Sequence, residues 1–74
     1  MSIADQARAD VAAEFAGTYR VWLMPATWPG SAHRRNLLKH DVEARCAAER
    51  GVTGRNRGRY QRAFHRAVKE AWER

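Results

Sequence analysis

The chain has 74 residues, a formal net charge of +6 and a hydrophobic content of 45%. This length suffices for one small core, so residues 1–74 are expected to form a single domain. A single cysteine excludes an intrachain disulfide framework, and no apolar run approaches the roughly 18 residues of a membrane-spanning helix.

The lone thiol, Cys46, suits a reducing compartment. Asp5 and Asp10 occupy the region in which a secretory signal would carry positive charge. We therefore expect a cytoplasmic protein that does not enter membranes. A domain of this size buries only about 60% of its unfolded surface, so a homodimer is one way to supplement its core.

Residues 3–23 have the spacing of an amphipathic helix. Ser2 is its expected N-cap, and Asp5 places negative charge in the first turn. Residues 18–24 also fit a short strand, but no second strand-like run is present to pair with them. We therefore expect one helix that ends before Pro25. Its apolar positions are Ile3, Ala7, Val11, Phe15, Tyr19 and Trp22.

A turn is predicted at residues 24–30, which hold both prolines and a glycine. Ser31 is the expected cap of a second helix over residues 32–50, and Gly51 supplies the left-handed residue that commonly closes a helix. Cys46 falls on the apolar stripe of this helix with Leu38 and Val42. It is therefore interpreted as a small buried hydrophobic residue.

The last helix is predicted over residues 59–73. The preceding segment 52–58 is expected to be a flexible loop rich in glycine and arginine, with Thr53 or Asn56 as the helix cap. Three helices with short connections pack most simply as an all-α, compact three-helix bundle. The apolar stripe of the last helix consists of Tyr60, Phe64, Ala67, Val68, Ala71 and Trp72.

Positive charge is concentrated at the C-terminal end. Residues 51–74 carry seven basic and two acidic side chains, a net charge of +5, whereas residues 1–30 have a net charge of −1. Such a gradient attracts polyanions or acidic protein faces, although a solvated face in an arginine-rich chain would look the same. The predicted contacts are Arg55, Arg57, Arg59, Arg62, Arg66 and Lys69, with Arg34 and Arg35 as auxiliaries.

Part of a DNA-reading helix-turn-helix pattern is present at Ala47 and Gly51. The match fails at Arg57, where a buried aliphatic residue is expected. Gly54 and Gly58 would also lie inside the recognition helix, at about 1 kcal/mol each. A helical hairpin whose basic loop contacts phosphates without necessarily reading bases fits better.

Trp28 lies in the predicted turn. It either folds back as a lid over the core or stands exposed as a binding hot spot, since tryptophan and arginine are enriched at such positions.

The residue types used in catalysis are scattered. His33, His40 and His65 have no spacing that would activate Cys46 or complete a metal site. We therefore expect neither an enzyme nor a cofactor or metal.

These patterns favour a small non-enzymatic module that binds nucleic acid through phosphate contacts. The alternative is a protein-binding adaptor or inhibitor, of the kind that phages and other mobile elements use. It would dock its basic face on an acidic patch or in a nucleic-acid groove of a larger host complex.

Overall fold

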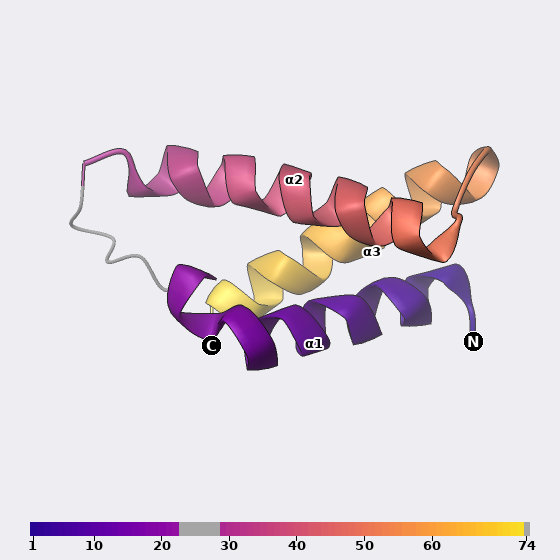
Figure 1. Ribbon diagram of the computed structural model, residues 1–74, viewed down its shortest axis with the longest axis horizontal. Coiled ribbons are helices and arrows are strands. Elements are labelled where there is room, and N and C mark those ends of the chain that lie inside the picture. The colour runs from indigo at the N-terminus through magenta and orange to yellow at the C-terminus, as the bar shows by residue number, and fades with distance from the viewer. Residues whose placement is uncertain (23–28, 74) are drawn as a thin grey trace.

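Three helices make up the computed structural model: α1 (Ile3–Trp22), α2 (Ser31–Arg50) and α3 (Arg55–Trp72). The structure describes residues 1–22 and 29–73, with the backbone alone for residues 18–22. Figure 1 shows α1 and α3 running in the same general direction, with α2 antiparallel to both. The molecule measures 37 × 19 × 18 Å. The expected all-α three-helix bundle is thereby confirmed.

By sequence alone, residues 18–24 fit either the end of the first helix or a short strand. Residues 18–22 are helical, so the strand alternative is wrong for them, and residues 23–24 lie outside the described residues. None of the three described helices is long and apolar enough to cross a membrane.

The core lies mainly between α1 and α3, which make the most extensive helix–helix contact. α3 contributes Tyr60, Phe64 and Val68, which are fully buried at successive turns of one side. The predicted stripes of α1 and α3 are confirmed where side chains are described, and Cys46 is buried as expected. Among the described side chains, the buried hydrophobic residues are Ala7, Val11, Cys46, Ala47, Tyr60, Phe64 and Val68.

Two predicted helix termini are confirmed. The Asp5 N–H donates to Ser2 Oγ at 3.1 Å, which makes Ser2 the cap of α1. Gly51 adopts a left-handed conformation (φ 72°) after α2. Its N–H donates to the Ala48 carbonyl at 3.1 Å, and the Val52 N–H donates to the Ala47 carbonyl at 3.0 Å. This pair of hydrogen bonds is a Schellman motif.

The N-terminus of α2 differs from its prediction. Ser31 is the first residue of α2 and is buried, so it is not the cap. Gly30 precedes it with a left-handed backbone (φ 74°) and no side-chain cap hydrogen bond.

The N-terminus of α3 differs more. The helix begins at Arg55, four residues before the predicted start, and Gly58 lies within it. The predicted flexible loop over residues 52–58 is therefore wrong for residues 55–58, and the connection is short. Gly54, rather than Thr53 or Asn56, precedes the helix, again without a side-chain cap hydrogen bond. The physical reason is tertiary: as described below, the first turns of α3 are bound to the other helices, which offsets the poor helix propensity of Gly58.

Candidate nucleic-acid interface

Asp10 of α1 connects all three helices. Arg50 of α2 donates to both carboxylate oxygens, Nε at 2.6 Å and Nη2 at 2.8 Å, and the Tyr60 hydroxyl of α3 donates at 2.6 Å. Burial works to raise the pKa of Asp10, but the hydrogen bonds from Arg50 and Tyr60 outweigh it and lower the pKa. Burial and the same carboxylate raise the pKa of Tyr60. At neutral pH Tyr60 therefore remains a protonated donor and Asp10 an ionised acceptor.

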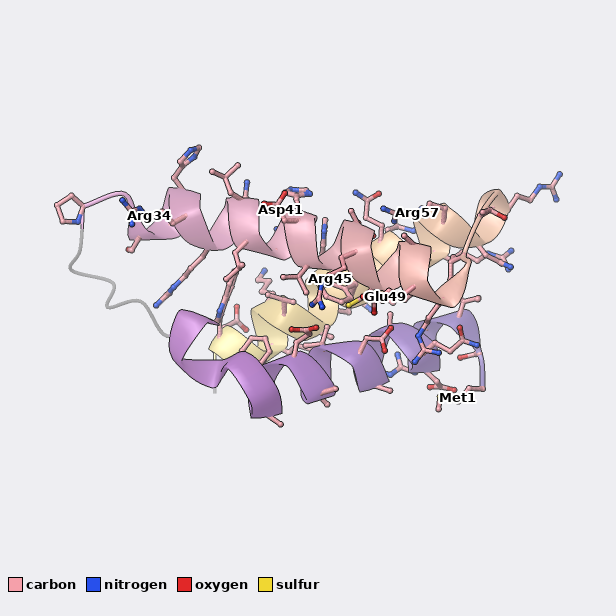
Figure 2. The ribbon with its side chains drawn as sticks, in the orientation of Figure 1. Met1, Arg34, Asp41, Arg45, Glu49 and Arg57 are labelled. Carbon is pink, nitrogen blue, oxygen red and sulfur yellow. The ribbon has the colours of Figure 1, made fainter. Side chains whose placement is uncertain are left out.

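Glu14 of α1 pairs with a second arginine of α2. Arg45 forms an ion pair with it across the helix interface, and Figure 2 shows Arg45 on the side of α2 that faces α1. The Cys46 thiol lies 3.8 Å from Glu14 Oε1. Burial and then this carboxylate raise the pKa of Cys46, which keeps it a thiol rather than a reactive thiolate.

Glu43 of α2 is the most deeply buried charged residue among the described side chains, with 1% of its surface exposed. Arg57 Nη1 forms an ion pair with Glu43 Oε2, without the alignment of a hydrogen bond. His65 Nε2 lies 3.9 Å from Glu43 Oε1, beyond hydrogen-bond distance. The His40 ring packs edge-on against His65 at 4.7 Å between centroids. Burial, followed by the positive charges of Lys39, His40 and Arg57, lowers the pKa of His65 to about 4.

The outer side of α3, opposite Tyr60, Phe64 and Val68, carries a continuous row of cations. We call this row the arginine face. All its members are exposed, and among the described residues no carboxylate lies within ion-pair distance of any of them. The arginine face consists of Arg55, Arg59, Arg62, Arg66 and Lys69.

Three predicted contacts lie apart from the arginine face. Arg57 is on the inner side of α3, against Glu43. Arg35 of α2 lies against Trp72, with its guanidinium carbon 5.7 Å from the ring centroid. Arg34 is exposed and lies near the start of α2. Figure 2 shows it far from Arg57, which lies beside the other end of α2. Trp28 lies outside the described residues.

A groove between α1 and α3 adjoins the arginine face. Its floor is apolar and half-buried, formed by Ile3, Ala4, Ala63 and Ala67. Its rim carries four arginines, and Ser2 and Glu70 complete its lining. Three of the rim arginines belong to the arginine face, and the fourth, Arg8 of α1, also pairs with Asp5. The rim consists of Arg8, Arg59, Arg62 and Arg66.

Sequence reasoning missed Arg8 because its own helix is almost neutral, and only the packing of α1 against α3 brings it to the groove. It also missed Glu43, whose burial no apolar periodicity signals. The one available signal was Arg57 itself, a charged residue three positions before Tyr60 and therefore on the side of the apolar stripe.

Within residues 1–22 and 29–73 no group of three or more histidine, cysteine or acidic side chains could hold a metal ion. The histidines divide between an exposed position, His33, and the half-buried His65 with its neighbour His40. No family model, curated protein or solved structure matches this chain.

Proposed function

We propose that this protein is a non-enzymatic module that binds nucleic acid by contacting phosphates with the arginine face. The observation that supports this function is the division among its arginines. Arg45, Arg50 and Arg57 each meet a carboxylate of another helix, whereas the arginine face has no such partner among the described residues. Its charge therefore remains available to an external polyanion.

The dimensions of the arginine face suit a nucleic-acid backbone. From Arg55 to Lys69 the helix rises about 21 Å, which spans several consecutive phosphates. Guanidinium groups can contact phosphate oxygens in a bidentate manner, which favours arginine over lysine. The N-terminus of α3 has no acidic residue in its first turn, so its helix dipole adds to the attraction for an anion. Contacts of this kind position a protein on the backbone and do not read sequence.

The test is a titration of a fluorescent duplex with the wild-type protein at several salt concentrations. We expect the logarithm of affinity to fall linearly with the logarithm of salt concentration, with a slope of about −3 to −4 if four phosphates are contacted. The variant Arg59→Gln/Arg62→Gln/Arg66→Gln should reduce the slope by about 3. Absence of binding at low salt, or unchanged binding by a folded triple variant, would overturn the proposal.

A matched pair of single variants controls for net charge. Arg62→Gln and Arg34→Gln each remove one exposed guanidinium, but only Arg62 belongs to the arginine face. We expect Arg62→Gln to weaken binding several-fold more than Arg34→Gln. Equal effects would mean that net charge alone determines binding.

One observation favours the alternative of a protein-binding adaptor or inhibitor. The groove beside the arginine face has an apolar floor, which phosphate binding does not require. A stoichiometric protein complex that survives nuclease treatment during co-purification would support this function, and light scattering would reveal a homodimer. Loss of all partners on nuclease treatment would leave nucleic-acid binding as the function.

A further inference from the structure

The groove between α1 and α3 combines two kinds of surface. Ala63 and Ala67 of α3 face Ile3 and Ala4 of α1 across its floor, and none of these side chains donates or accepts a hydrogen bond. A phosphate placed on this floor would lose hydration without gaining a partner. The floor is therefore suited to an apolar ligand surface. The four arginines of the rim outnumber its one carboxylate, Glu70, so the rim is suited to negative charge.

The shape of the groove favours a helix as the occupant. Its α3 side extends from Arg59 to Glu70, a rise of about 16 Å or three helical turns. Three of the four floor side chains are alanines, and small residues let a neighbouring backbone approach closely. An amphipathic helix laid there would place apolar residues on the alanines and acidic residues beside the arginines. A second copy of this chain fits poorly because its net charge is +6.

We propose that the groove between α1 and α3 binds an acidic amphipathic helix of a partner protein. This inference is independent of the proposed nucleic-acid function, but the two ligands share Arg59, Arg62 and Arg66. Such a partner would therefore compete with nucleic acid for the protein. Arg55 and Lys69 lie outside the groove lining, and Arg8 and the floor lie outside the arginine face.

The probe is a designed peptide of about 14 residues, stapled across one turn because short isolated helices are only marginally stable. Leucines at spacings of three and four residues form its apolar face, and glutamates flank them. One control peptide has glutamine in place of each glutamate, and another has the same composition in scrambled order. Fluorescence anisotropy at low salt should give a Kd on the order of 10 µM for the acidic peptide and much weaker binding for both controls.

Variants separate the two ligands. Arg8→Gln on the rim and Ala67→Gln on the floor should each weaken peptide binding about five- to tenfold. Neither should change duplex affinity by more than about twofold. Arg55→Gln should show the reverse, weakening duplex binding while leaving peptide binding nearly unchanged. Circular dichroism verifies that each variant is folded. If Ala67→Gln does not fold, Arg8→Gln alone tests the groove.

The outcomes distinguish this proposal from the nucleic-acid function. No saturable binding of the acidic peptide up to about 1 mM, or equal binding of the scrambled peptide, would overturn the groove as a helix site. The same conclusion follows if saturating peptide leaves the amide NMR signals of Ala63 and Ala67 unperturbed. Peptide binding without duplex binding would instead overturn the nucleic-acid function and leave this proposal standing.

Discussion

The two sides of α3 differ in whether their cations have carboxylate partners. On the inner side, Arg57 meets the buried Glu43, and Tyr60 donates to Asp10 together with Arg50. On the outer side, the arginine face has no carboxylate partner among the described residues. Both sides belong to one helix of 18 residues, so the difference arises from where the other helices place their carboxylates.

The comparison shows how the acidic residues are used. Asp10, Glu14 and Glu43 each pair with an arginine of another helix, and these contacts join α1 to α2 and α2 to α3. Ionic contacts on the inner side therefore contribute to helix packing. On the outer side the cations have no carboxylate partner among the described residues and repel one another slightly.

Replacing Glu43 with alanine should have the largest effect on stability. It leaves Arg57 without its partner, and Arg57 is only partly able to reach solvent because 37% of its side chain is exposed. We expect a loss of about 2–3 kcal/mol in the free energy of unfolding, measured with urea. The control is Glu49→Ala, since Glu49 is largely exposed on the same helix and should cost under about 0.5 kcal/mol. Equal losses for the two variants would contradict a structural role for the Glu43–Arg57 pair.

Tyr60→Phe tests the second inner contact with a change of one hydroxyl group. The ring remains buried, but Asp10 loses the donor at 2.6 Å. Because the acceptor is ionised, we expect a destabilisation of about 1.5–3 kcal/mol. The same substitution in an Asp10→Asn background should cost less, because the acceptor is then uncharged. An additive double variant would show that the Tyr60 hydroxyl does not act through Asp10.

The burial of His65 predicts a pH dependence of stability. Its pKa falls from 6.5 to about 4 in the folded protein. Between these values the unfolded chain binds the proton more readily, so stability is highest above pH 6.5 and declines as the pH falls toward 4. Between pH 7 and pH 5 we expect a loss of about 1–2 kcal/mol in urea unfolding.

The groups that face His65 are Glu43, Arg57, His40 and Lys39, so its environment combines one carboxylate with several cations. His65→Gln should flatten the pH dependence, whereas His33→Gln, at an exposed position, should leave it unchanged. An unchanged slope in His65→Gln would assign the effect to another group.

The fold was predicted well from the sequence because apolar spacing and helix caps depend on residues that are close together in the chain. The stripe of α3, the Ser2 cap and the left-handed Gly51 required no knowledge of helix packing. The start of α3 was misplaced because Gly58 lowers helix propensity, whereas the contacts of Arg57 and Tyr60 with other helices decide the boundary.

The candidate site was predicted only in part, for the same reason. Arg62, Arg66 and Lys69 were predicted because they repeat along one exposed side of the predicted last helix, and Arg55 and Arg59 because they extend the positive charge into the preceding loop. Arg57 was grouped with them by its proximity in sequence, although it lies on the inner side, and Arg8 was omitted because it is remote in sequence. Which arginines have partners depends on where the carboxylates of other helices lie, and no local pattern encodes that position.

The smallest expected change in stability is also the one that best separates the two sides of α3. Arg55 is an exposed cation in the first turn of a helix that has no acidic residue there, so it opposes the helix dipole. Arg55→Glu should therefore stabilise the protein by about 0.3–1 kcal/mol in urea unfolding. The same variant should weaken duplex binding more than Arg55→Gln does, because it adds repulsion from phosphate to the loss of a contact. A stabilised variant with impaired binding would mean that Arg55 contributes to ligand binding and lowers the stability of the fold. Destabilisation would instead place Arg55 among the structural arginines and shorten the arginine face by one residue.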